Sequence, residues 1–129
     1  MNRYMEMAVN LAKMAAGQTA VNPPVGAVIV KNGRVIGYGA HIKSGEQHAE
    51  RAALEHCTGS PEGADIYVTL EPCSHHGKTP PCTDALISAG IKRVFYAVRD
   101  HNKKVDGLSI LNDQGIETIH LEHQEIETL

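Results

Sequence analysis

The sequence predicts an α/β protein, a three-layer α/β/α sandwich built around a mixed five-stranded sheet. Three observations support this prediction. Short apolar runs alternate with segments of helical periodicity, an Asn-Gly turn joins two of these runs, and the later strands and helices follow one another in βαβ order. At 129 residues the chain suits one domain that buries roughly two thirds of its unfolded surface.

The chain begins with a predicted amphipathic helix at residues 3–16, which leads to a buried strand. The apolar face of this helix, which we expect to pack in the core, comprises Tyr4, Met5, Ala8, Leu11, Ala12 and Ala15. Two prolines then precede residues 25–30, a continuous apolar run. Such a run is typical of a strand that is buried on both faces.

An antiparallel hairpin is predicted next. Asn32-Gly33 separates the first strand from a second at residues 35–41, and Asn-Gly is a strong signal for a tight hairpin turn. Gly37 and Gly39 interrupt the second strand. We expect them to allow close approach of another backbone segment.

The second half of the chain alternates helices and strands. In chain order we expect a helix opened by residues 44–47, a strand at 65–70, a helix at 82–89, a strand at 93–98, a short helix at 108–112 and a strand at 116–121. His48 and Glu50 fall in the first turn of the first of these helices. Residues 1–121 therefore form the predicted domain, and 122–129 a loose acidic tail.

Composition narrows the class of partner. The net charge of −3 argues against a general polyanion binder, and one Phe with no Trp leaves little surface for stacking nucleic-acid bases. No stretch has the length of a membrane span or the pattern of a secretory signal, and three cysteines is an odd number. We therefore expect a cytoplasmic protein that acts on a small molecule, with no nucleic-acid or membrane partner.

Four residues have the chemistry of a catalytic zinc site, namely His48, Glu50, Cys73 and Cys82. Such a site takes three protein ligands and leaves one position to water. Glu50 lies two residues from His48, so the two do not share a helix face and only one of them is expected to be a ligand. Cys82 opens a predicted helix, where a thiolate is stabilised.

The alternative for each residue alone is structural. A single buried cysteine is more often a small core residue than a ligand, and Cys57, at a helix end, keeps that interpretation. The histidines at 41, 56, 101, 120 and 123 are each more often surface or hydrogen-bonded residues than ligands. Only the set of His48, Cys73 and Cys82 favours a metal site.

These motifs resemble those of known deaminases. His48-Ala49-Glu50 followed by Pro72-Cys73 resembles the zinc-dependent cytidine deaminase superfamily. The longer block at residues 67–82, Tyr-Val-Thr-Leu-Glu-Pro-Cys-Ser-His-His-Gly-Lys-Thr-Pro-Pro-Cys, is similar to the deaminase domain of the bifunctional riboflavin-biosynthesis enzymes, and the likeness covers most of residues 1–120.

The resemblance implies a cytidine deaminase-like fold and a specific reaction. That reaction is hydrolytic deamination of 2,5-diamino-6-(ribosylamino)-4(3H)-pyrimidinone 5′-phosphate, with zinc held by His48, Cys73 and Cys82 and protons moved by Glu50. The implied residues around the substrate are Asn22, His41, His76, Lys78 and Asn102. Members of the family generally continue into a reductase domain, so a fused or separate reductase is the implied partner, and a homo-oligomer stays open.

The chain departs from the family after the fourth predicted strand. Asp100-His101-Asn102-Lys103 and the following residues lack two prolines and a glycine that the family has there. The main alternative is another cytosine, cytidine or guanine deaminase, which the long insert between the cysteines disfavours. From another class, a non-catalytic zinc-stabilised binding module is the alternative, and Glu50 argues against it because a structural site would fill its fourth position with Cys or His.

Overall fold

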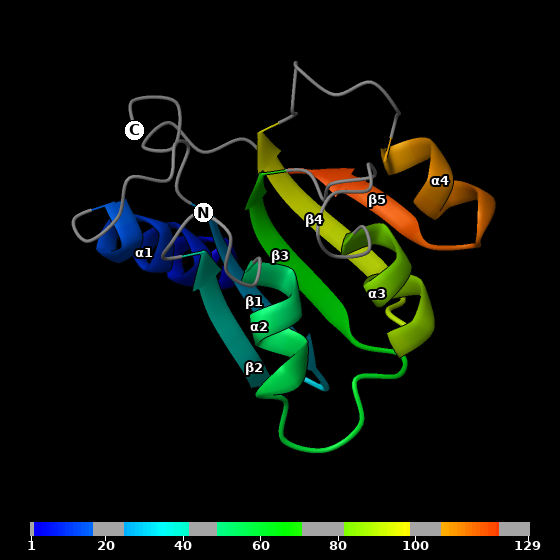
Figure 1. The fold of residues 1–129 in the computed structure, drawn as a ribbon, viewed down its shortest axis with the longest axis horizontal. Helices are drawn as coiled ribbons and strands as arrows, with labels where there is room; N and C mark the ends of the chain where they lie inside the picture. The colour runs from blue at the N-terminus through cyan, green and yellow to red at the C-terminus, as the bar shows by residue number, and fades with distance from the viewer. Residues whose placement is uncertain (1, 17–24, 42–48, 71–81, 99–106, 122–129) are drawn as a thin grey trace.

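A computed structural model describes residues 2–16, 25–41, 49–70, 82–98 and 107–121 (Figure 1). Within these ranges the elements are α1 (Arg3–Ala16), β1 (Val25–Lys31), β2 (Arg34–His41), α2 (Ala49–Glu55), β3 (Asp65–Leu70), α3 (Cys82–Ala89), β4 (Arg93–Val98), α4 (Gly107–Asp113) and β5 (Glu117–His120). All five predicted strands are confirmed, with β5 slightly shorter than expected. The predicted tail at 122–129 and His48 lie outside the described residues.

The sheet is mixed, as predicted. Its strand order is β2-β1-β3-β4-β5, with β1 antiparallel to both β2 and β3, and with β3, β4 and β5 parallel. The hairpin between β1 and β2 turns through Asn32 and Gly33, whose φ angles of 53° and 74° lie in the left-handed region. Both residue types tolerate this region, which is why the Asn-Gly signal predicted the turn correctly.

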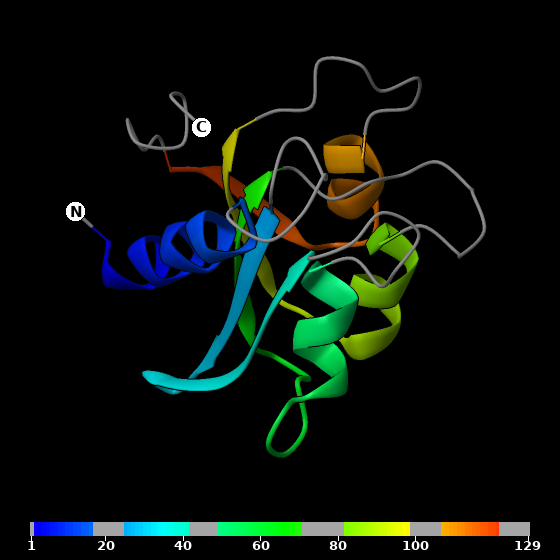
Figure 2. The same ribbon diagram turned by 60° about the vertical axis from the view of Figure 1, so that its left-hand side comes forward.

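The helices cover both faces of the sheet (Figure 2). The single helix α1 lies on one face, and α2, α3 and α4 lie on the other. The α1 face buries Met5, Val9, Val28 and Tyr67, whereas the opposite face buries Ile29, Ile66, Leu86 and Val94. Because successive side chains of a strand point to opposite faces, β1 contributes to both layers and is buried from Val25 to Val30. Among the described helices, none is long and apolar enough to cross a membrane.

Ends of four strands, β1, β2, β3 and β4, meet at one edge of the sheet. The carboxyl ends of β3 and β4 meet there, since Leu70 pairs with Val98. The antiparallel strand β1 starts at the same edge, because Ala27 pairs with Val68, and β2 ends there with His41 opposite Val25. We call this the carboxyl edge.

The opposite edge is closed by backbone hydrogen bonds. The turn after α2 is bound to β2 through Thr58 N–H and Ile36 O at 2.7 Å. The segments leading into β3 and β4 are bound to each other, since Lys92 N–H donates to Ala64 O at 2.8 Å. Next to that bond, Arg93 forms a two-pronged ion pair with Asp65, with distances of 2.9 and 2.8 Å.

Candidate active site

Glu50 is a buried acidic residue in the first turn of α2, at the carboxyl edge. Its exposed fraction is 4%, a low value for glutamate, which is mostly exposed in folded proteins. The sequence predicted this residue for the first turn of a helix, and the structure confirms that position. A buried carboxylate is a candidate for proton transfer.

The position of α2 depends on two glycines of β2. A Cβ atom on Gly39 would lie 2.8 Å from the carbonyl oxygen of Ala49, and a Cβ on Gly37 would lie 2.5 Å from that of Ala53. Real Cβ atoms essentially never come so close, so only glycine lets α2 pack directly on the strand. The expected close approach is confirmed, and it fixes Ala49, the neighbour of Glu50, beside the end of β2.

The helix α3 brings a second element start to the same region. It begins at Cys82 and ends near Gly90, whose carbonyl oxygen accepts a hydrogen bond from Gly63 at the opposite edge. The start of α3, at Cys82, therefore lies at the end of the helix that is nearer to the carboxyl edge. The helices α2 and α3 lie side by side on one face of the sheet in both views (Figures 1 and 2), so their first turns approach the same region.

The structure describes only some of the predicted site residues. Of the proposed set, Glu50 is described in full, and His41 and Cys82 are described as the last residue of β2 and the first of α3. The remaining residues lie outside the described part of the chain, namely Asn22, His48, Cys73, His76, Lys78 and Asn102. Within the described ranges, no group of three or more metal-binding side chains occurs.

Residues that the sequence analysis set aside behave as expected where they are described. Cys57 is a free cysteine that packs against the core, and burial raises the pKa of its thiol, which disfavours the thiolate that zinc requires. His56 contacts the carbonyl oxygen of Ala52, and His120 contacts that of Ala97 at 2.9 Å. The core packing of Cys57 and the hydrogen bonds of the two histidines agree with the interpretation given to them from the sequence.

The sequence analysis missed a buried threonine that supports this edge. Thr69 is 1% exposed, and its hydroxyl oxygen accepts a hydrogen bond from the Gly26 N–H at 3.1 Å. The bond follows directly after the last ladder pair of β1 and β3, Ala27 with Val68. It fixes the start of β1, the strand that Asn22 precedes by sequence. In the sequence, the sign of this role is the hydroxyl residue Thr69 within the otherwise mainly apolar run at 66–70.

Replacing Thr69 with valine should lower the free energy of unfolding by about 1–3 kcal/mol, the cost of a buried donor without an acceptor. The hydroxyl is lost while the shape of the side chain is kept, so the Gly26 N–H is left unsatisfied. Urea denaturation of both proteins measures the difference. Thr69→Ser keeps the acceptor and serves as the control that retains the hydrogen bond. A valine variant as stable as the wild type would show that this hydrogen bond contributes nothing measurable.

The layered mixed sheet is that of the cytidine deaminase-like fold. The family model described as the cytidine and deoxycytidylate deaminase zinc-binding region matches residues 1–98, and the chain belongs to this family.

Within this family, the chain is most similar in sequence to deaminases of riboflavin biosynthesis among the relatives compared. The chain is 48% identical over 108 residues to a diaminohydroxyphosphoribosylamino-pyrimidine deaminase from Buchnera aphidicola, covering 84% of this chain and 74% of the relative. It is 52% identical over 116 residues to the riboflavin biosynthesis protein RibD of Bacillus amyloliquefaciens, covering 88% of this chain. The chain spans only 31% of the length of that RibD protein.

A solved structure supports the same assignment. The diaminohydroxyphosphoribosylaminopyrimidine deaminase and 5-amino-6-(5-phosphoribosylamino)uracil reductase of Thermotoga maritima superposes with a TM-score of 0.91 at 46% identity. The match covers 98% of this chain and 38% of the Thermotoga chain. The predicted fold and the resemblance to riboflavin-biosynthesis deaminases are both confirmed.

Proposed function

We propose that the chain removes the 2-amino group of 2,5-diamino-6-(ribosylamino)-4(3H)-pyrimidinone 5′-phosphate in riboflavin biosynthesis. The observation that supports this most strongly is its 48% identity to the Buchnera deaminase, whose name specifies a diaminopyrimidine carrying a phosphoribosyl group, over 74% of that protein. The reaction consumes one water and releases ammonia, leaving a carbonyl where the amino group was.

The proposed zinc ligands are His48, Cys73 and Cys82, and the donor chemistry fits this metal. One imidazole and two thiolates match the ligand set of catalytic zinc sites. His48 immediately precedes the first residue of α2, and Cys82 is the first residue of α3. Cys73 follows the last residue of β3 by three positions, within about 10 Å of extended chain. When bound, zinc would supply a Lewis acid that lowers the pKa of water towards about 7.

In this mechanism Glu50 performs the proton transfers. Its carboxylate takes a proton from the attacking water as oxygen bonds to the ring carbon that carries the amino group. It then gives that proton to the departing nitrogen, so that ammonia leaves as the carbon–nitrogen bond breaks. Glu50 is buried in the first turn of α2, and this burial keeps its carboxylate away from bulk water, which supports the proposed role.

The proposed substrate contacts all flank the carboxyl edge in sequence. Asn22 precedes β1, His41 ends β2, and Asn102 follows β4. His76 and Lys78 lie between β3 and α3, in the insert that separates the two cysteines. Open α/β sheets commonly bind their ligands beyond the carboxyl ends of the strands, which supports this assignment.

Lys78 is the proposed contact to the ribose phosphate. Lys78→Ala should lower kcat/KM for the phosphorylated aminopyrimidine by more than about tenfold, or ~1.4 kcal/mol, because an ammonium is a point-charge phosphate ligand. It should barely change turnover of the dephosphorylated nucleoside. Assaying both substrates with both proteins completes the cycle, and an equal loss on each would show that Lys78 does not read the phosphate.

The proposed function is tested by ammonia release from a panel of compounds. The panel contains the phosphorylated diaminopyrimidinone, its dephosphorylated form, cytosine, cytidine, dCMP and guanine. We expect the phosphorylated diaminopyrimidinone to have the highest kcat/KM. Preference for one of the other bases would identify a different small-molecule deaminase, and no ammonia from any compound by zinc-loaded protein would support a non-catalytic zinc-stabilised module.

A further inference from the structure

The ladder between β1 and β3 stops short of the carboxyl edge. Its last pair is Ala27 with Val68. Beyond that pair, β1 stays paired with β2 as far as Val25, and β3 stays paired with β4 as far as Leu70. At this edge the antiparallel half of the sheet and the parallel half are therefore no longer joined by the β1–β3 ladder.

The side chain of Thr69 joins the two halves at this point. Its hydroxyl oxygen accepts the Gly26 N–H, and the bond is buried. Tyr67 belongs to the core on the α1 side, and alternate residues of a strand share a face, so Thr69 also faces α1. Glu50 belongs to α2, on the other face of the sheet. The Thr69 hydroxyl is therefore separated from the proposed proton carrier by the sheet itself.

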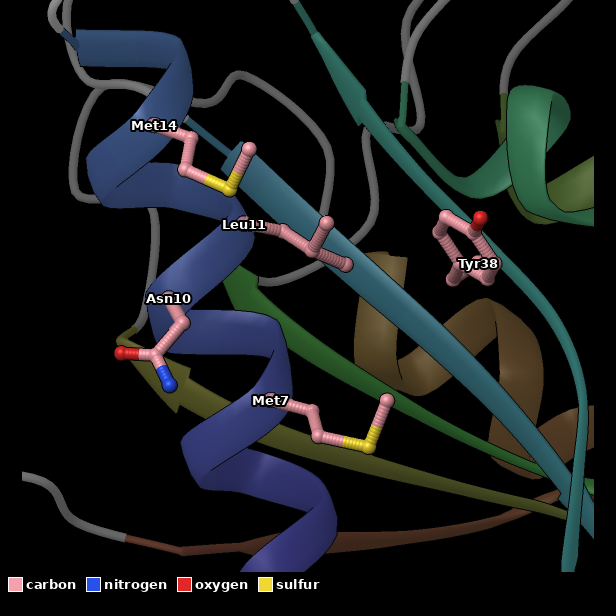
Figure 3. A pocket seen from close by; sticks show the side chains of 5 residues that line it. All are labelled: Met7, Asn10, Leu11, Met14 and Tyr38. Atoms are coloured by element: carbon pink, nitrogen blue, oxygen red, sulfur yellow. The ribbon is translucent and has the colours of Figure 1, made fainter.

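The helix α1 covers this bond. A Cβ atom on Gly26 would collide with the carbonyl oxygen of Ala8 and would lie 3.0 Å from the Cβ of Leu11. In Figure 3, Leu11 points from α1 toward β1. A groove of about 220 Å³ lies next to it, lined by Met7, Asn10, Leu11, Met14 and Tyr38. Because Leu11 contacts both the groove and Gly26, it separates the bond from water in the groove.

Both partners of the bond lead by sequence to proposed site residues. Gly26 comes four residues after Asn22, the proposed substrate contact, and Thr69 comes four residues before Cys73, a proposed zinc ligand. Four residues span at most about 14 Å of extended chain. The relative position of these two strand ends therefore limits where the substrate contact and the ligand can lie.

We propose that Thr69 is a positioning residue for the deamination, and that its hydroxyl fixes the start of β1, and through it Asn22, relative to the end of β3. This inference rests on the proposed function. Without the hydroxyl, the Gly26 N–H is buried with no acceptor, and the start of β1 moves until this group meets water. Asn22 then binds the substrate less well, whereas Glu50 stays in place on α2. Substrate binding suffers more than the chemical step.

The test compares Michaelis constants of zinc-loaded variants on the phosphorylated diaminopyrimidinone. Thr69→Val should raise KM by about tenfold, with kcat within about threefold of wild type, which is the pattern of lost substrate binding. A protein that is merely less stable would instead lose kcat, because unfolded molecules lower the active fraction without changing KM. Thr69→Ser keeps the acceptor and should restore the wild-type KM. Thr69→Ala removes the acceptor with a smaller side chain, so the test does not depend on the valine variant folding.

The matched control is Tyr67→Phe. It also removes a hydroxyl from the α1 face of β3, two positions before Thr69, but this hydroxyl is bonded to Asn2 at the start of α1 rather than to β1. Its KM should equal that of the wild type. Metal analysis of every variant should find the same zinc content, which separates a displaced substrate contact from a lost ligand.

Hydrogen exchange of the Gly26 amide reports on the bond without any turnover. Exchange should be about tenfold faster in Thr69→Val than in the wild type, and unchanged in Thr69→Ser. An unchanged KM or an unchanged exchange rate in both the valine and the alanine variants would overturn the inference. If the wild type prefers another base of the panel, the proposed substrate is wrong, and the same comparison on that base still decides the role of Thr69.

Discussion

Replacing Glu50 with glutamine is expected to lower the rate of deamination by at least about 10²–10⁴-fold, while zinc content and fold are kept. Glutamine has the size of glutamate and can still form hydrogen bonds, but it cannot accept the proton of the attacking water. Glu50 lies in the first turn of α2 and is 4% exposed, so few other groups can replace its function. Steady-state kinetics on the phosphorylated diaminopyrimidinone measures the loss.

The control for Glu50 is on the same helix. Glu55→Gln makes the same chemical change at the last residue of α2, on an exposed side chain, and is expected to keep wild-type turnover. Metal analysis and a urea denaturation curve of the Glu50 variant are needed because the side chain is buried. Wild-type turnover by a folded, zinc-loaded Glu50→Gln protein would show that another group moves the proton.

Replacing Cys82 with alanine is expected to reduce bound zinc from one per chain to a small fraction, and deamination should fall with it. Removing one of three protein ligands costs more than disturbing a residue that only orients a ligand, and that smaller change already costs about 10–100-fold in affinity. Elemental analysis after dialysis against a weak chelator measures zinc directly. The same treatment of wild type followed by added zinc should restore activity.

The matched control is the cysteine that the structure places in the core. Cys57→Ala removes a thiol whose pKa is raised by burial, so zinc content should stay at the wild-type value. Stability should fall modestly, because Cys57 packs against the core cluster. Full zinc occupancy in Cys82→Ala would remove Cys82 from the proposed ligand set.

The sequence predicted the local elements well because their signals are local. The Asn32-Gly33 turn follows from two residues that tolerate positive φ, and the apolar run of β1 follows from burial on both faces. The close packing at Gly39 was also predicted. For the site, the sequence predicted where Glu50 stands on α2, and this too depends only on where a helix starts.

Other features depend on which strands become neighbours, and a single sequence does not state this. The hydrogen bond from Gly26 to Thr69 joins residues 43 positions apart, and it exists only because β3 pairs with β1. The stacking of Tyr67 on Phe95, with ring centres 4.4 Å apart, depends in the same way on the pairing of β3 with β4. The groove beside Tyr38 arises because α1 packs near an edge strand.

Two main-chain hydrogen bonds help to hold the edge opposite the site, beside the ion pair of Arg93 with Asp65. The bonds from Thr58 to Ile36 and from Lys92 to Ala64 use no side chain, so most substitutions there leave them intact. Longer loops attached at the carboxyl edge would add only a slowly growing entropy cost. We therefore expect that loops carrying substrate contacts can be exchanged between relatives. Such an exchange would change which base is deaminated and would leave the sheet and its helices unaltered. Grafting the residues between β3 and α3 from another deaminase would be the simplest such exchange.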